Sequence, residues 1–545
     1  MSPDQYKRLT GNGSIVSAAL IVGASSLLSR IIGLIRERVF TTTFGAGDTF
    51  DAFVAAFRIP DLIFNLIVLG ALSAAFIPLF TDKLVNGKKG RQSSAFDFAI
   101  SLFNLIVLGV GVLSVIYALF APQIVPLIAP GFEGEKLALT IRLSRIMALQ
   151  PILLSVSFIF SGILNSFKRF VAYAIAPVVY NLGIIFGAVY LVPLMGIMGL
   201  GWGVVLGGAL HLIVQLPSAL RVGFRWKPLL ISSYDDFTQL WHMMLPRVFG
   251  LAAQQLNLLV VTILGSGLLA GSITAFHLAN NIYHLPIGIF GIAFAQAAFP
   301  TMAEQVSRKK RAAFKQTVTR SFRYILFFVI PISAFLFLLR AQTVRVLFGD
   351  GAFDWEDTIL TFETLKFLVI SIFAQATIPL LTRAFYAERN TRTPVIIAIV
   401  AMVVNVVLAL ALSPIMGVQG LALAFSLASI VQLVSLLGML HWRLHGFDDG
   451  QIIRSLAKIV LATIVSAAIL QLLKYPIAMV VDMQRFWGVF MQLVITLTGG
   501  GAMYVWLCWL MQCDEILAVN KYLPRKWRVN SVGGTDTPRF GEVPE

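Results

Sequence analysis

Three arginines interrupt an apolar stretch near the start of the chain. Arg30, Arg36 and Arg38 lie in "LLSRIIGLIRER", residues 27–38, at the end of an apolar run that begins near Ser14. An arginine near the centre of a lipid-facing helix costs about 2.5 to 3.5 kcal/mol on insertion scales, so these side chains are expected to face protein or water. A guanidinium group presents a planar fork of donors that matches phosphate oxygens. We therefore predict that Arg30 and Arg36 bind a phosphorylated anion.

Helical spacing arranges small and polar residues around these arginines. Arg30 and Arg36 are about 120° apart on an ideal helix, so both reach one cleft only if the cleft is wide or Gly33 permits a bend. In the alternative, Arg36 and Arg38 extend to the membrane surface and Glu37 pairs locally. We assign Gly33 and Glu37 a gating or structural role. One predicted stripe contains Gly23, Ser26, Arg30, Gly33 and Glu37, and an adjacent stripe contains Ser25, Ser29 and Arg36.

The next apolar segment repeats this pattern with opposite charge. Asp51, Arg58 and Asn65 are spaced by seven residues, and Asp61 lies on the same segment. Asp51 near Arg30 or Arg36 would hold the guanidinium groups in place, because a buried charge is tolerated when it is paired. A structural ion pair without a role in transport is the alternative. We predict Asp51 and Arg58 as substrate-binding residues and Asp61 as a structural one.

The second half of the chain carries a further polar face. His277, Asn280, Asn281 and His284 share one helix face, and Gln254 belongs to a shorter stripe with Arg247 and Asn257. We predict His277, Asn281 and His284 as substrate-binding residues and Gln254 as a structural residue; hydrogen bonding between helices is the alternative. Together with the N-terminal stripes, these residues predict a central hydrophilic cavity with a net positive charge.

The elements that must position these residues are membrane-spanning helices. The 545 residues are 58% apolar and 12% charged, with a mean hydropathy of +0.85, which is typical of an integral membrane protein. Apolar runs of about 20 residues recur, each long enough to cross about 30 Å of hydrocarbon as a helix. We predict an all-α membrane protein with helices at 14–43, 49–82, 95–128, 136–166, 170–194, 198–222, 237–266, 272–303, 316–347, 357–388, 393–413, 417–444, 451–475 and 485–513.

Charge and motifs exclude several other classes. The net charge is +16, but the basic residues fall mainly between apolar runs, as in loops that orient a membrane protein, so no nucleic acid partner is expected. These loops predict cytoplasmic N- and C-termini. No GxxxxGK[ST], HExxH or CxxC motif occurs, so we predict no ATPase motor, no metal site and no cofactor, while a membrane enzyme without such a motif stays an alternative at this point. The prediction of a transporter and not an enzyme comes from the family resemblance described below. Cys508 and Cys513 are five residues apart, which predicts different helix faces and no disulfide.

An internal duplication organises the chain. "PLMGIMGL" at 193–200 recurs as "PIMGVQGL" at 414–421, Asn181 recurs as Asn405, and "AAFIP" at 74–78 recurs as "AAFP" at 297–300. The nearly constant offset predicts two six-helix lobes with the same orientation around a central cavity. We predict an N-lobe at 14–222, a C-lobe at 237–444, two extra helices at 451–513 and a cytoplasmic, basic and disordered tail at 514–545.

An ordered set of motifs resembles one family. "SRIIGLIRE" at 29–37, "FGAGDTFDAF" at 44–53, "APGF" at 129–132, "LPIGIFGIAFAQAAFP" at 285–300 and "RAFYAERNTRTP" at 383–394 together resemble the MurJ (MviN) family of bacterial lipid II flippases. That family belongs to the multidrug/oligosaccharidyl-lipid/polysaccharide exporter superfamily. The resemblance implies a flippase that moves lipid II, the polyprenyl-diphosphate disaccharide-pentapeptide of peptidoglycan and cell wall synthesis, from the inner to the outer leaflet by alternating access.

The resemblance also assigns residues. Arg30 and Arg36 match two arginines that the family needs, Asp51 matches its aspartate, and Arg58 stands where the family often has a basic residue. The chain departs from the family at Phe64 and Asn281, where arginines are common. We hypothesise that Arg58, His277 and His284 supply some of the missing donors, and the alternative is a related lipid-linked substrate with a less charged head.

The resemblance implies a multi-pass protein of the bacterial cytoplasmic membrane, driven by the membrane potential or a coupling cation. Lipid II and membrane lipids are the expected partners, with cell-wall synthases as further candidates. The alternatives are a flippase for another polyprenyl-diphosphate-linked glycan, a drug/cation antiporter, and a non-transporting scaffold for cell-wall synthesis.

Overall fold

The protein is helical throughout the part of the chain that the structure describes. The structure is a computed structural model, and it describes residues 15–69, 76–86, 92–230 and 234–516. Within these residues there are no strands, and ten helices are long and apolar enough to cross a membrane, or eleven if α16 and α17, bent by 46°, form one span. The predictions of an all-α and multi-pass membrane protein are confirmed, whereas the count of fourteen crossings stays a prediction.

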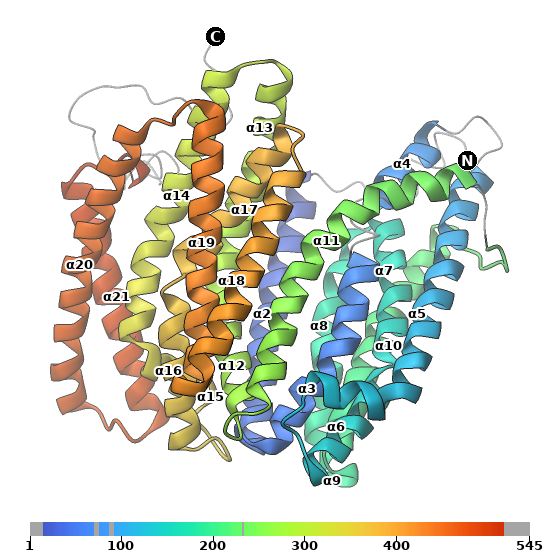
Figure 1. The fold of residues 1–545 in the computed structure, drawn as a ribbon, viewed down its shortest axis with the longest axis horizontal. Coiled ribbons are helices and arrows are strands. Elements are labelled where there is room, and N and C mark those ends of the chain that lie inside the picture. The colour runs from blue at the N-terminus through green and yellow to red at the C-terminus, as the bar shows by residue number, and fades with distance from the viewer. Residues whose placement is uncertain (1–14, 70–75, 87–91, 231–233, 517–545) are drawn as a thin grey trace. The chain divides into compact units, whose positions relative to one another are not determined.

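Contacts divide the helices into two units. The first unit contains residues up to Thr274 together with Asp350–Asp354, and the second contains Ala275–Gly349 and residues from Trp355 onward. The helices of the first unit are α2 (Ile15–Phe44), α3 (Asp48–Ile63), η1 (Phe64–Leu69), α4 (Ile77–Asn86), α5 (Gln92–Ile128), α6 (Gly134–Met147), α7 (Gln150–Ser166), α8 (Phe170–Phe186), η3 (Gly187–Leu191), α9 (Val192–Met195), α10 (Met198–Arg221), α11 (Tyr234–Gly265) and the start of α12 (Ser272–Pro286) (Figure 1).

The second unit begins inside α12. Its further helices are η4 (Ile287–Ile292), α13 (Ala293–Ser307), α14 (Arg311–Leu338), α15 (Arg340–Phe348), α16 (Trp355–Val369), α17 (Ile372–Ala387), α18 (Arg392–Met416), α19 (Val418–Leu444), α20 (Asp449–Val480) and α21 (Phe486–Leu510). Each predicted range contains helix, although several ranges are divided into two or three pieces. The contacts place α11 in the first unit, and the predicted lobe boundary between 222 and 237 stays a prediction.

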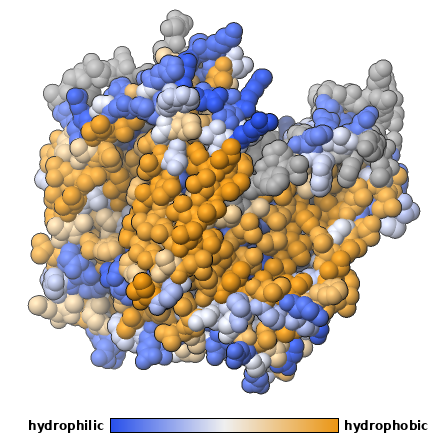
Figure 2. Space-filling model, in the orientation of Figure 1, coloured by the Kyte–Doolittle hydropathy of each residue, from blue (hydrophilic) through white to orange (hydrophobic). Residues whose placement is uncertain are grey.

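The outer surfaces of the helices are apolar. Figure 2 shows hydrophobic side chains over the middle of α18 and α19, with hydrophilic side chains above them. In the most apolar 18 residues of α18, only 17% is buried inside the protein. Ile396, Val403 and Val407 are among the exposed side chains of this helix. Apolar surface of this kind is expected to face lipid, because water would penalise it.

Glycines let α8 and its η3 continuation pack directly against α10. A Cβ atom added at Gly187 would lie 2.3 Å from the Cα of Gly203, and one added at Gly183 would lie 2.6 Å from the Cα of Gly207. These neighbours are backbone atoms, which cannot turn away as a flexible side chain can. The seam therefore requires glycine, and it holds Asn181 of α8 in a fixed position beside α2.

The seam yields a first prediction. Replacing Gly187 by alanine is expected to lower the free energy of unfolding by about 1 to 3 kcal/mol, because the extra methyl group overpacks the seam. Equilibrium unfolding of the purified protein in mixed detergent micelles measures this change. Gly111→Ala on α5 is the matched control, since a Cβ there meets nothing within 4 Å. Equal stability of the two variants would show that α8 and α10 do not pack as described.

Backbone geometry supports the duplication. Gly196 and Gly417, which are equivalent in the two copies, have φ values of 63° and 61°. A Cβ at Gly199 would lie 2.4 Å from the backbone of Leu191, and one at the equivalent Gly420 would lie 2.4 Å from that of Leu412. The same turn and close approach therefore occur twice. Asn181 and Asn405 are both buried, while residues 74 and 75 of the third repeated motif lie outside the described residues.

The C-terminal end of α21 differs from the prediction for the two cysteines. Cys513 lies beyond the end of the helix, and the turn there, with Gln512 at φ 49°, brings the backbone N–H of Cys513 to the carbonyl of Cys508 at 2.9 Å. This is the contact of a Schellman motif, which folds the chain back over the last turn. Both thiols are buried and free, and the side-chain hydrogen bond to Cys508 together with burial raises the pKa of Cys513.

Part of the predicted tail is packed. Glu515 is buried and forms an ion pair with Arg323 of α14 at 2.8 Å and accepts a hydrogen bond from Ser455 of α20 at 2.7 Å. These contacts hold the end of α21 against α14 and α20. Residues 517–545 of the predicted tail lie outside the described residues.

Candidate functional site

Arg36 is bound by protein groups between α2 and α8. Its Nη1 atom donates to the side-chain oxygen of Asn181 at 3.0 Å, and its Nη2 atom forms an ion pair with Glu37. The side chain of Glu37 is 2% exposed and that of Arg36 is 22% exposed. The local pairing of Glu37 that the sequence offered as an alternative is therefore present. The positive charge of Arg36 is balanced within the protein.

Asn181 connects α8 to a second polar group of α2. Its Nδ2 atom donates to the hydroxyl of Ser29 at 3.3 Å and to the carbonyl of Pro177 at 3.0 Å. The stripe predicted to contain Ser29 and Arg36 thus faces α8. From the sequence, Asn181 was recognised only as a residue that recurs in the duplication. Its signal as a site residue was an amide in an apolar helix, because a buried amide needs a polar partner.

Arg30 has a different environment from Arg36. Its side chain is exposed, and the described residues provide it with neither a hydrogen bond nor an ion pair. A Cβ atom at Gly33, one turn further along α2, would meet nothing within 4 Å, so the helix surface around Arg30 is open. Glu37, predicted on the same stripe, is instead buried.

Asp51 accepts hydrogen bonds from the beginning of α12. Its Oδ1 atom accepts from the backbone N–H of Thr274 and from the Thr274 hydroxyl, both at 2.8 Å, and its Oδ2 atom accepts from the backbone N–H of Gly271 at 2.8 Å. A carboxylate at this position satisfies the unpaired amides of a helix N-terminus and favours the helix dipole. These partners differ from the guanidinium groups that the sequence suggested.

Lys136 of α6 completes this cluster. Its ammonium group lies 3.2 Å from Asp51 Oδ2 and 2.6 Å from Asp48 Oδ1, and 4.1 Å from the ring centroid of Phe132. Asp51 is 1% exposed, so its charge is both buried and paired. Lys136 was not among the residues predicted from the sequence. Its signal was a lysine directly after "APGFEGE", a loop that is otherwise free of lysine and arginine.

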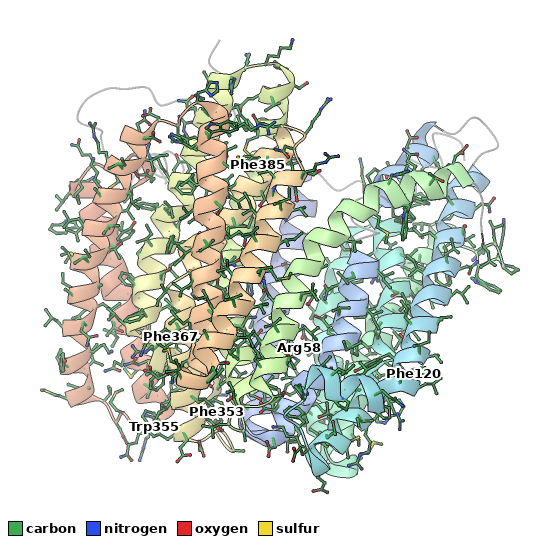
Figure 3. The ribbon with its side chains drawn as sticks, in the orientation of Figure 1. Arg58, Phe120, Phe353, Trp355, Phe367 and Phe385 are labelled. Atoms are coloured by element: carbon green, nitrogen blue, oxygen red, sulfur yellow. The ribbon has the colours of Figure 1, made fainter. Side chains whose placement is uncertain are left out.

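Arg58 lies between α3 and α11 (Figure 3). Its Nε atom donates to the hydroxyl of Thr262 at 2.8 Å, and the side chain is half-buried. Asn65, one heptad later, donates to the backbone carbonyl of Asp61 at 2.8 Å. The predicted heptad therefore extends from α3 into η1, and Asp51 at its start binds the beginning of α12.

The predicted residues of α12 lie in the second unit. His277 and Asn281 contact each other through a ring nitrogen and an amide nitrogen 3.2 Å apart, and both are half-buried. The ring of His284 packs against the ring of Tyr283 at 5.2 Å. Gln254 belongs to α11, and its side chain lies outside the described residues. Among the described residues, no group of three or more His, Cys, Asp or Glu side chains is suited to a metal ion.

Within the first unit, the structure therefore forms three separate polar clusters from the predicted residues. They are Arg36 with Glu37 and Asn181, Asp51 with Lys136 and the start of α12, and Arg58 with Thr262. Only Arg30 is a charged, exposed side chain without a protein partner among the predicted residues whose side chains are described in this unit.

The family profile and two similar proteins point to one family. The profile of the family "Lipid II flippase MurJ" matches residues 40–494. A probable lipid II flippase MurJ of Rhizobium tropici is 30% identical over 476 residues, covering 85% of this chain and 87% of that protein. One of Rhizobium meliloti is 31% identical over 471 residues, covering 84% and 86%.

Solved structures share the fold. A structure titled "Lipid II flippase MurJ, inward closed conformation" has a TM-score of 0.76 at 23% identity, covering 91% of this chain and all of that chain. An inward-facing multidrug resistance MATE family transporter of the MOP superfamily has a TM-score of 0.65 at 13% identity, covering 78% and 98%. With the family profile spanning most of its length, the chain belongs to the MurJ family of lipid II flippases.

Proposed function

We propose that this protein flips lipid II across the bacterial cytoplasmic membrane by alternating access, and that Arg30 binds the diphosphate of the substrate. The exposed guanidinium of Arg30, without a protein partner among the described residues, carries the proposal. An arginine in a membrane helix is costly unless it meets an anion or water. Diphosphate oxygens match its donors in geometry and charge.

Arg36 has a different role in this proposal. Because Glu37 already balances its charge, Arg36 binds the substrate only to the extent that the guanidinium leaves Glu37. Arg58 supplies an additional donor to the substrate. Substrate binding by His277, Asn281 and His284 stays a prediction from the sequence. The polyprenyl tail stays in lipid, which removes the need to bury it inside the protein.

Orientation follows from the loops. The loops poor in lysine and arginine, including residues 44–50 and 129–135, lie on the outer side, and both termini are cytoplasmic. In this orientation the Asp51 cluster closes the outer end. Outward movement of an anion is favoured by an inside-negative potential by about 2.3 kcal/mol per charge per 100 mV, so the potential supplies driving force without an ATPase.

The test replaces Arg30. A bacterial strain depleted of its own flippase is expected to grow with the wild-type protein but not with Arg30→Ala. Lipid II in that strain is also expected to stay inaccessible to an externally added lipid II-degrading toxin when only Arg30→Ala is present. The unfolding free energy of this variant is expected to stay within about 0.5 kcal/mol of wild type, because the side chain is exposed and makes no hydrogen bond or ion pair with the described residues. Arg30→Lys retains charge but loses the bidentate fork, so partial activity is expected.

Arg485→Ala provides the matched control, because this side chain is 83% exposed and lies outside the proposed site. Full growth and toxin-accessible lipid II with Arg30→Ala would refute the ligand role. Binding of cell-wall synthases without any exposure of lipid II by the wild-type protein would instead support a scaffold.

A further inference from the structure

A glycine in the loop between α5 and α6 lies directly against the end of α11. The backbone N–H of Gly131 donates to the hydroxyl of Ser266 at 3.0 Å. A Cβ atom at Gly131 would lie 2.3 Å from the backbone oxygen of Ser266 and 2.6 Å from the Cα of Gly267. No side chain larger than hydrogen fits unless one of the two backbones moves.

A second glycine makes the corresponding contact with the end of α2. In the loop between α15 and α16, a Cβ atom at Gly351 would lie 2.5 Å from the backbone oxygen of Thr42. The backbone N–H of Ala352 donates to that same oxygen at 2.9 Å, and Arg38 forms an ion pair with Asp350 at 3.1 Å. The loop residues Asp350–Asp354 belong to the first unit for this reason, although the helices on both sides belong to the second.

The two contacts are related by the internal duplication. Gly351 follows Gly131 by 220 residues, and Ser266 follows Thr42 by 224 residues, close to the offset of the repeated motifs. In each copy, the loop after the third predicted helix therefore contacts the end of the first predicted helix of the other copy. Two chance contacts would not be expected to obey the symmetry of the duplication.

The Asp51 cluster also obeys the internal duplication. Thr274 follows Asp51 by 223 residues, so the two are equivalent positions that contact each other. Between them, the turns at Ala46 and Gly271 approach so closely that a Cβ at Gly271 would lie 1.9 Å from the Ala46 oxygen. All of these residues belong to the first unit.

We propose that the contacts of Gly131 with Ser266 and of Gly351 with Thr42 form a matched pair of glycine clasps that close this end of the protein and separate when it opens during flipping. The inference rests on the proposed function for its role in transport. Glycine is required because backbone meets backbone, and a hydrogen bond at each clasp is readily exchanged for water when the clasp opens. A side chain at either position overpacks the closed state, and at Gly351 it also strains the left-handed backbone, which has a φ of +61°.

A labelling experiment measures closure without transport. Ala46→Cys, in a background with Cys508→Ala and Cys513→Ala, places a thiol at a position that is 4% exposed beside the clasps. Adding Gly131→Ala or Gly351→Ala is expected to speed reaction of the purified protein with a water-soluble maleimide by about 5- to 150-fold, the range for overpacking strain that acts on one of two states.

Two glycines serve as matched controls. Gly134 has a left-handed backbone, with φ +51°, as Gly351 does, but a Cβ atom at Gly134 would meet nothing within 4 Å, so Gly134→Ala is the first control. Gly111→Ala on α5 also has open space and a right-handed helical backbone. Both are expected to leave the labelling rate unchanged. If the clasp variants label no faster than these controls, the clasps do not hold this end closed.

A reversible lock tests the role in transport without adding strain. Thr42→Cys with Ala352→Cys joins the second clasp by a disulfide, and its formation is followed by the loss of free thiols. Toxin-accessible lipid II is expected to fall to background on oxidation and to return with reductant, while each single cysteine variant flips normally. Unchanged flipping by the cross-linked protein would overturn the proposal. Absence of flipping by the wild-type protein would instead refute the proposed function. The maleimide labelling rates would still show whether the clasps hold this end closed.

Discussion

Replacing Asp51 by alanine is expected to lower the free energy of unfolding by about 3 to 5 kcal/mol, the range for removing one partner from a buried charged pair. The carboxylate accepts hydrogen bonds from Gly271 and Thr274 and pairs with Lys136, and it is 1% exposed. Its removal leaves helix N-terminal amides without an acceptor in a buried site, and each such group carries a desolvation cost. Equilibrium unfolding in mixed detergent micelles measures the loss.

Asp48→Ala is the matched control for this measurement. Asp48 lies on the same helix and binds the same ammonium group at 2.6 Å, but its side chain is 63% exposed. An exposed pair contributes about 0 to 1 kcal/mol, so a small effect is expected. Asp51→Asn is expected to fall between the two, because one amide oxygen retains some of the hydrogen bonds without the charge. Equal losses for Asp48→Ala and Asp51→Ala would contradict the burial and hydrogen bonding described here.

Replacing Arg36 by alanine is expected to destabilise the protein by about 3 kcal/mol, near the lower end of the range for a buried pair. The lower end applies because 22% of the Arg36 side chain is exposed. The substitution leaves Glu37 charged and buried in a membrane helix, and it removes the donor that Asn181 accepts from. The same unfolding measurement in micelles tests this value, with Arg30→Ala expected to have little effect.

A double-mutant cycle separates the pair from its surroundings. Arg36→Leu with Glu37→Leu removes both charges, so the double variant is expected to be more stable than Arg36→Leu alone. A coupling energy near zero would mean that Glu37 does not hold Arg36. In that case, Arg36 would be as available to an anion as Arg30.

The expected effects separate residues that act in transport from residues that stabilise the fold. Arg30 is expected to affect transport with little effect on stability, whereas Asp51 and Arg36 are expected to affect stability strongly. Loss of growth in the last two variants would therefore not by itself identify a substrate ligand. Unfolding measurements must accompany any transport assay on this chain.

Sequence alone determined the class, the helices and the family of this protein. Apolar runs of about 20 residues and a mean hydropathy of +0.85 are local properties, and each predicted range contains helix. The duplication was also visible in the sequence, because motifs such as "PLMGIMGL" and "PIMGVQGL" recur at a nearly constant offset, and the equal φ values of Gly196 and Gly417 support it. Helix periodicity could place Arg36 on a stripe, but it could not show that Asn181 lies opposite.

Only the tertiary structure decided which polar residues meet. Asp51 contacts a residue 223 positions later, and Arg36 contacts one 145 positions later, so the spacing within one helix carries no information about either partner. The amides that bind Asp51 belong to the backbone of a helix end, which any sequence can provide. The same holds for the glycine clasps, because a close approach of two backbones has no residue signature beyond glycine itself.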